Sequence, residues 1–324
     1  MTSEYSYWMA LAHLPRWRTE RINQLLIEIL HRRQMALQDF FALSPDEWQQ
    51  EFALTATEVV KMNEAKAELP NYAFLAEELS AQGFQIVPFN APEYSAVLKK
   101  NLQIKHAPPV LYAKGNLKQL HEPTVAVVGS REASERALQF ADAIAKKCAA
   151  EFRVVVSGFA KGVDKQALDS SLKYGGHSII VLPQGILTFG GGIKKYYPQI
   201  VEGDVLVLST FFPKAGWDAG LAMARNVYIY GLAEEIYVAE SDNKGGTWTG
   251  VMDGLKKGRT IYVRQPESDE KNANSLLIAK GAIAVDAEGN KLLVDAAASK
   301  QDHAPETRVE ASQNLKVQMT LFER

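Results

Sequence analysis

Two strand-turn-helix units follow one another between Thr124 and Asp164, and they constrain the fold more than any other stretch of the chain. In each unit a short apolar, β-branched run ends in a glycine-containing turn, and a helix begins soon after. The runs are Val125–Val128 and Val154–Val156. Buried strands joined by helical crossovers predict a parallel sheet, whose ligands bind beyond the carboxyl ends of the strands. We therefore expect a binding site where the two turns meet.

The predicted sheet extends from about Thr124 to Asp286. Its six candidate strands are Val125–Val128, Arg153–Val156, Ser178–Leu182, Val205–Leu208, Glu235–Ala239 and Thr260–Val263. Two further short strands are expected upstream, at Phe84–Phe89 and in the run that ends at Gly115. The stretch from Pro183 to Gly203 shows no clear periodicity, so we expect a long functional loop there.

The N-terminal third of the sequence is typical of a helical domain. Ser44 is followed by a proline and by Glu47, which predicts a capped helix start. We divide the chain into a helical domain at 1–82, a sheet domain at 83–290 and a flexible tail at 291–324. The last residues, LKVQMTLFER, fit either a short strand or a partner-binding peptide.

Composition excludes several classes of protein. The 36 Lys and Arg residues are balanced by 38 Asp and Glu residues, so any anion site must be a local patch. The one cysteine, Cys148, excludes a disulfide framework and fits a reducing cytosol, and we expect it to be buried. No apolar run is long enough to cross a bilayer, and the N-terminus is not typical of a signal peptide. A cytoplasmic protein without membrane contact is expected.

Glycine-containing turns on one sheet edge carry most of the candidate phosphate-binding residues. Backbone N–H groups, hydroxyls and helix N-termini favour anions there, and nearby arginine or lysine side chains add charge. The candidates are Gly129, Ser130, Arg131, Ser157, Gly158, Lys161, Gly162, Asp164, Lys194, Lys195, Arg225, Asn226, Lys244, Gly245, Gly246 and Thr247.

Structural roles are open for the same residues. Arg131 also fits an exposed position in a tight turn, and Arg225 fits a salt bridge. Asp164 and Thr247 are each suited to capping a helix. Asp164 is equally suited to orienting a neighbouring cation.

The sequence lacks the common catalytic and cofactor patterns. The glycine turns match neither G-x-G-x-x-G nor G-x-x-x-x-G-K-[ST]. No serine is flanked as G-x-S-x-G, and the six histidines show no metal-ligand spacing. We expect a binding protein rather than an enzyme, with no cofactor and no metal.

An ordered set of motifs resembles the bacterial DprA/Smf (DNA-processing protein A) family over about Tyr7 to Asp286. The matching segments are Pro109–Asn116, Val127–Arg131, Ser157–Asp164, Val181–Gly185, Tyr197-Pro198, Arg225-Asn226, Gly231-Leu232, Gly246–Thr249, Gly258-Arg259 and Gly281-Ala282. Leu168, Met223 and Val227 stand where the family usually has His, Phe and Arg, so the resemblance is to a divergent member. The tail is too short for the family's C-terminal winged-helix domain.

The resemblance implies an α/β fold, with an extended Rossmann-like sheet domain that follows a small SAM-like helical domain. It further implies single-stranded DNA bound in a basic pocket at the sheet edge, with Arg131 on a phosphate. A homodimer through the sheet domain, loading of a RecA-type recombinase and a role in recombination and natural transformation are also implied.

Two other classes of function stay open at this point. One is a nucleotide-binding sensor or nucleoside-phosphate hydrolase of the same superfold, because Lys244–Thr247 partly resembles its P-G-G-x-G-T motif. The other is an interaction protein, for example in defence against foreign DNA.

Overall fold

The computed structural model of the protein describes residues 4–292. Six helices form the N-terminal part: Glu4–Ala12 (α1), Thr19–Ile27 (α2), Leu37–Ala42 (α3), Pro45–Phe52 (α4), Ala56–Ala67 (α5) and Leu69–Ala81 (α6). The predicted helix start at Ser44 is confirmed, because the Ser44 hydroxyl accepts from the Glu47 N–H while the Glu47 carboxylate accepts from the Ser44 N–H. Gly83, in the left-handed region at φ 72°, follows the end of α6.

One nine-stranded sheet organises the rest of the described chain. Its strands are Gln85–Pro88 (β1), Val110–Lys114 (β2), Thr124–Val128 (β3), Val154–Ser157 (β4), Ser178–Val181 (β5), Val205–Ser209 (β6), Glu235–Val238 (β7), Ile261–Arg264 (β8) and Ile283–Val285 (β9). All six strands predicted from about residue 124 onward are present, as are both upstream strands. The short strand β9 was not predicted.

The strand order β1-β2-β6-β5-β4-β3-β7-β8-β9 creates a topological switch point. From β3 the chain adds β4, β5 and β6 on one side, then returns to add β7, β8 and β9 on the other, all parallel. Beyond β6, the pairs β6–β2 and β2–β1 are antiparallel. The loops after β3 and β7 therefore diverge at one edge, which is where ligands of doubly wound sheets bind.

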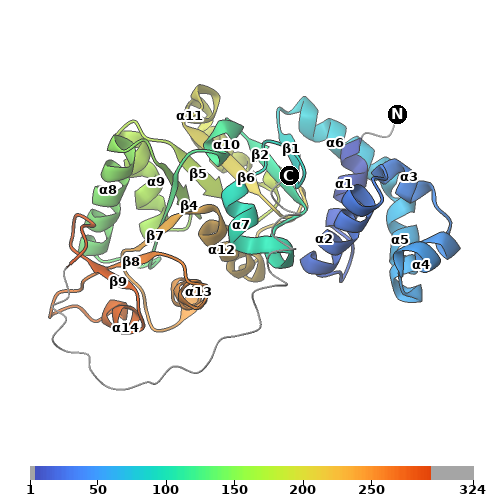
Figure 1. The fold of residues 1–324 in the computed structure, drawn as a ribbon. Coiled ribbons are helices and arrows are strands. Elements are labelled where there is room, and N and C mark those ends of the chain that lie inside the picture. The colour runs from blue at the N-terminus through green and yellow to red at the C-terminus, as the bar shows by residue number, and fades with distance from the viewer. Residues whose placement is uncertain (1–3, 293–324) are drawn as a thin grey trace, which may run out of the picture.

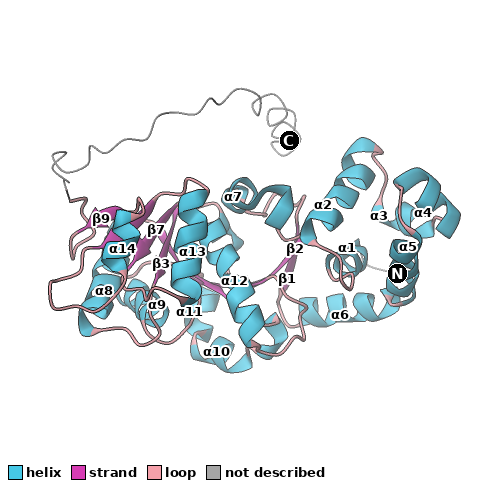
Figure 2. Cartoon of the chain, turned by 90° about the horizontal axis from the view of Figure 1, so that it is seen from below, coloured by secondary structure: helices cyan, strands magenta, loops and turns pink. Residues whose placement is uncertain are grey.

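Helices cover both faces of the sheet, as an α/β fold requires. The helices of this part are Ala96–His106 (α7), Glu135–Ala150 (α8), Val163–Lys173 (α9), Gly190–Lys195 (α10), Tyr197–Glu202 (α11), Ala219–Leu232 (α12), Gly245–Lys256 (α13) and Asn274–Ala279 (α14). Val125 and Val127 of β3 pack towards α8 and α9. Ala126 and Val128 pack into the opposite core, which includes α12. Figure 2 shows α12 and α13 side by side in front of the strands.

The N-terminal helices gather at one end of the molecule, beside β1 (Figure 1). Leu11 of α1 and Leu79 of α6 belong to the same buried cluster as Leu111 of β2 and Val207 of β6. The apolar core is therefore continuous from these helices into the sheet. Our division at residue 82 stays a prediction.

The stretch from Pro183 to Gly203 is not the long loop that we predicted. It contains a 3-10 turn at Ile186–Thr188 and the two short helices α10 and α11. Cys148 is buried on α8, as predicted, and burial raises the pKa of its thiol to about 12. Most of the predicted tail, from residue 293 onward, lies outside the described residues.

Candidate functional site

A cavity of about 480 Å³ opens at the switch point between β3 and β7. Its walls come from the loops that follow β3, β4 and β7 and from the start of α12 and α13. The predicted site residues that line it are Gly129, Ser130, Arg131, Asp164, Arg225, Asn226, Lys244, Gly245, Gly246 and Thr247. Ser157, Gly158, Lys161, Gly162, Lys194 and Lys195 do not line it.

The loop after β3 presents Arg131 to the cavity. The Ser130 N–H donates to the Glu240 carbonyl at 2.9 Å, and the Ser130 hydroxyl accepts from the Glu132 N–H at 3.1 Å. These bonds fix the turn and occupy groups that we had assigned to an anion. The exposed Arg131 side chain has no hydrogen bond or ion pair within residues 4–292. Arg131 is therefore free to bind a ligand.

The N-terminus of α13 forms the opposite wall. Lys244 precedes the helix in extended conformation, and its side chain does not cap the first turn. Thr247, a predicted cap, instead donates from its hydroxyl to the Gly129 carbonyl at 3.2 Å. The open N–H groups of this first turn carry the positive end of a twelve-residue helix dipole. With Lys244 beside them, they suit a phosphate group.

The turn after β4 is closed on itself. The Gly158 N–H donates to the Asp164 carboxylate at 3.1 Å, and the Ser157 hydroxyl donates to the Asp164 carbonyl at 2.7 Å. Arg225, which is 3% exposed, donates to the carbonyls of Gly158 and Val181. Arg225 thus shapes the wall of the cavity.

Burial dominates the electrostatics of these two charged groups. It raises the pKa of Asp164, an effect that the Arg225 guanidinium opposes. Burial likewise lowers the pKa of Arg225, and here the Asp164 carboxylate opposes it. Each charge therefore stabilises the ionised form of the other, which fits positioning roles for both residues.

A group of lysines lies next to the cavity on the side of the β4 turn. Lys161 is exposed in that turn, and Lys194 and Lys195 are exposed on α10. The two elements meet through Phe159, whose ring lies 5.8 Å from the Tyr196 ring, edge to face. These lysines can extend a cationic surface away from the cavity.

Two apolar residues complete the cavity, and our sequence analysis missed both as ligand contacts. Trp217, in the loop between β6 and α12, is 60% exposed, and Met223 of α12 is 49% exposed. Such exposure of large apolar side chains at a cavity fits contact with a ligand. The only sequence signal was an aromatic residue in a loop at the carboxyl edge of the sheet.

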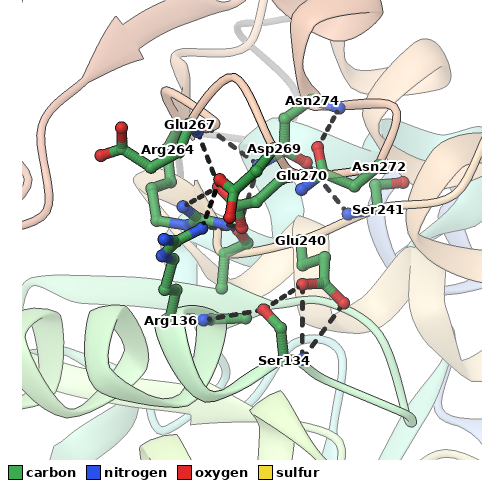
Figure 3. Close-up of polar contacts among 12 residues, drawn as sticks. Ser134, Arg136, Glu240, Ser241, Arg264, Glu267, Asp269, Glu270, Asn272 and Asn274 are labelled. Atoms are coloured by element: carbon green, nitrogen blue, oxygen red, sulfur yellow. Dashed lines mark hydrogen bonds and ion pairs between the residues drawn. The ribbon is translucent and has the colours of Figure 1, made fainter.

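A buried polar network holds the end of β7, and with it the approach to α13 (Figure 3). Arg264 binds the Glu270 carboxylate with two hydrogen bonds, at 2.9 and 2.6 Å, and also donates to the Ala239 carbonyl. Asn274 donates to the same carbonyl and accepts from the Ser241 N–H. Residues 239–241 are therefore held by side chains from β8 and α14.

Glu240 joins this strand end to the loop after β3. Its carboxylate accepts from the Ser134 hydroxyl, and Ser134 in turn caps α8 (Figure 3). Its carbonyl accepts from the Ser130 N–H. The two loops that flank the switch point are thus linked through one residue.

The cavity carries charges of both signs. Glu132 and Asp242 line it together with Arg131 and Lys244. Within residues 4–292 no three His, Cys, Asp or Glu side chains are grouped as metal ligands. No helix in the same part of the chain has the length and apolar character of a membrane span.

A doubly wound sheet with a cavity at its switch point defines an α/β protein of the kind that binds its ligand at the carboxyl edge of the sheet. The profile of the DNA recombination-mediator protein A family matches residues 85–296, which is more than half of the chain. The chain belongs to this family.

Relatives and solved structures agree with the assignment. The DNA processing protein DprA of Streptococcus pneumoniae is 34% identical over 160 residues, which cover 49% of this chain and 56% of that protein. The chain thus spans just over half the length of this relative. The X-ray structure of pneumococcal DprA superposes with a TM-score of 0.62 at 24% identity, covering 87% of this chain and 94% of that one.

A structure of DNA processing protein A from Helicobacter pylori, described for its single-stranded DNA binding mode, has a TM-score of 0.53 at 24% identity. It covers 62% of this chain and 90% of that chain. Both structural similarities confirm the predicted α/β fold.

Proposed function

We propose that this protein binds single-stranded DNA and holds one nucleotide unit of the strand in the cavity at the switch point. The observation that carries the proposal is the pairing of anion-binding groups with an exposed aromatic side chain in one cavity. Arg131 and the open first turn of α13 are the anion-binding groups, and Trp217 is the exposed aromatic side chain.

The arrangement favours unpaired over paired nucleotides. In the proposed mode a phosphate lies between Arg131 and the N-terminus of α13, and the attached base contacts Trp217 and Met223, which line the same cavity. Stacking on an aromatic side chain needs a free base face, which a single strand offers and a duplex hides. The cavity volume of about 480 Å³ suits a ligand of nucleotide size.

Phosphates that flank the bound nucleotide would follow the lysines outside the cavity. Lys161, Lys194 and Lys195 lie on the side of the β4 turn, where a strand leaving the cavity would pass. The Helicobacter pylori relative, described for its single-stranded DNA binding, supports the choice of ligand. Its 24% identity to this chain supplies no residue roles.

Family membership supports a further set of proposals about the whole protein. We propose that it acts in the cytoplasm in DNA recombination, including natural transformation or the handling of foreign DNA. A homodimer through the sheet domain and a RecA-type recombinase as partner belong to the same proposal, as does the division into a helical domain at 1–82 and a sheet domain at 83–290.

Fluorescence anisotropy tests the central claim. A labelled single strand, a duplex of the same length and a labelled mononucleotide are titrated with the full chain across a salt series. We expect the single strand to bind more tightly than the duplex, with an affinity that falls as salt rises. Binding of the mononucleotide without binding of either DNA would favour the nucleotide-sensor alternative and overturn the proposal.

A further inference from the structure

The loop between β6 and α12, residues 210–218, connects the N-terminal helices to the cavity. Near its start, the Phe212 ring lies against two aromatic rings from the helical part. It is 5.4 Å from the His13 ring, which directly follows α1, and 6.4 Å from the Tyr72 ring of α6, edge-on to both. His13 is itself held by a 2.8 Å hydrogen bond to the Tyr112 hydroxyl of β2.

Further contacts hold the same half of the loop. Lys214 forms a 2.8 Å ion pair with Glu78, which lies about 1.7 helical turns after Tyr72 on α6. The Gly185 N–H donates to the Ala215 carbonyl at 2.9 Å, and the Leu187 N–H donates to the Pro213 carbonyl at 3.0 Å. Residues 212–215 are therefore fixed both to α6 and to the segment after β5.

The second half of the loop carries the apolar wall of the cavity. Trp217 lines the cavity, and Asp218 then caps α12 by accepting from the N–H groups of Gly220 and Leu221 at 2.7 and 3.1 Å. Between the two fixed points, Gly216 faces open space. The place of Trp217 thus depends on where the Phe212 half of the loop is held.

We propose that Phe212 is a positioning residue for the nucleotide cavity, through which the N-terminal helices set the place of Trp217. This inference rests on the proposed function, because it assigns to the helical part control over the base-binding wall of that same site. A movement of α6 relative to the sheet would shift Phe212 and Lys214 together and carry Trp217 towards or away from the bound base. The helical part thereby becomes a regulator of strand affinity without touching the strand.

Fluorine NMR of fluorotryptophan-labelled protein tests the inference without DNA. The chain has five tryptophans, and a Trp217→Phe variant assigns the Trp217 resonance. In Phe212→Ala we expect this resonance to shift, and the affinity for a single strand to fall about three- to tenfold because part of one base-stacking contact is lost. The salt slope should stay unchanged, since no phosphate contact is removed.

Phe74→Ala is the control, because Phe74 lies on α6 near Tyr72 but is 67% exposed. It should leave the Trp217 resonance and the affinity as in the parent. A folded Phe212→Ala protein with an unchanged Trp217 resonance and affinity would overturn the inference, even if its melting temperature fell.

A charge reversal provides a second test that does not depend on the folding of Phe212→Ala. Lys214→Glu breaks the ion pair with Glu78, and the double variant Glu78→Lys, Lys214→Glu restores it with opposite polarity. We expect the Trp217 resonance to move in the single variant and to return in the double variant; an immobile resonance would contradict the inference. If the variants shift the Trp217 resonance but the parent protein binds no DNA, the proposed function is refuted and the positioning role of Phe212 is retained.

Discussion

Asp164 and Arg225 bind the two polar groups of one residue, Gly158, in the turn after β4. The Asp164 carboxylate accepts from the Gly158 N–H, and the Arg225 guanidinium donates to the Gly158 carbonyl. A side chain on residue 158 would collide with both groups. A glycine is therefore required there by the pair that surrounds it, and Arg225 acts on the shape of the site.

Replacing Arg225 should cost stability first. In Arg225→Met the Asp164 carboxylate loses its compensating charge, and the carbonyls of Gly158 and Val181 lose their donor. Breaking a buried charge pair in this way costs about 3 to 5 kcal/mol, which urea unfolding would measure. Asp164→Asn keeps an acceptor for the Gly158 N–H, so we expect a smaller loss. If Arg225→Met instead unfolds like the parent but binds DNA weakly, Arg225 is a phosphate ligand.

Arg131 should show the opposite behaviour. Its exposed side chain makes no hydrogen bond or ion pair within residues 4–292, so Arg131→Ala should unfold nearly like the parent. Losing one charge-assisted hydrogen bond to phosphate should weaken single-strand binding by about 1.5 to 3 kcal/mol and reduce the salt slope by about 0.7. Anisotropy across a salt series measures both quantities.

Arg136→Ala is the matched control for Arg131. Arg136 lies in the first turn of α8, the helix that follows the Arg131 loop. Its side chain is 47% exposed and forms a 2.7 Å ion pair with Asp269 (Figure 3). Its removal should change neither the affinity nor the slope by a comparable amount. Equal losses in the two variants would mean that the strand does not enter the cavity at Arg131.

The sheet and the edge that carries the site were predictable because they depend on local patterns. Apolar runs such as Val125–Val128 mark buried strands, and a glycine turn after each strand marks its carboxyl end. The switch point itself was not predictable in this way, because it requires β3 and β7 to be neighbours and local patterns do not give the strand order.

The errors arose where tertiary contacts override local preference. Three successive glycines, Gly190 to Gly192, are poor helix formers, yet α10 forms there, with the Phe189 ring packed against Gly192. The burial of Arg225 and its bonds to the carbonyls of Gly158 and Val181 were also invisible in the sequence, and its role as a phosphate ligand stays a prediction. Trp217 belongs to no motif, and only the fold brings it to the cavity.

Lys194 and Lys195 should strengthen single-strand binding through their charge, although neither lines the cavity. Replacing both with glutamine should weaken single-strand binding at low salt and reduce the salt slope by about 1.4 if each contacts one phosphate. Stability should not change, because both are exposed on α10. Lys256 and Lys257, at the far end of α13, form the matched control pair. A slope that is the same in both double variants would exclude the α10 lysines from the path of the strand.

Trp217 should matter through its ring. Trp217→Ala should weaken binding of a single strand by about 1 to 3 kcal/mol, the range for one base stacked on an aromatic side chain. Trp217→Phe keeps an aromatic face and should recover much of that loss. The salt slope should be the same in all three proteins, since stacking releases no counterions. If phenylalanine and alanine weaken binding equally, the base does not stack at this position.

His13 should make the junction between the helical part and the sheet sensitive to acid. Burial lowers the pKa of its imidazole from 6.5 to about 4 in the folded protein. The unfolded chain therefore binds more protons between these values, and stability that is fully present above pH 6.5 is lost as the pH falls towards 4. Each pKa unit corresponds to about 1.4 kcal/mol, and partial exposure of the ring reduces the total, so we expect a loss of about 2 kcal/mol.

Urea unfolding of the parent and of His13→Gln at pH 7 and pH 4.5 isolates the contribution of His13. Glutamine can still bond to the Tyr112 hydroxyl but does not titrate, so its stability should fall less over the same interval. Other acidic groups titrate equally in both proteins and cancel in the difference. Identical pH dependence in the two proteins would contradict the prediction. It would show that water reaches the His13 ring in the folded protein, including the side that faces Phe212.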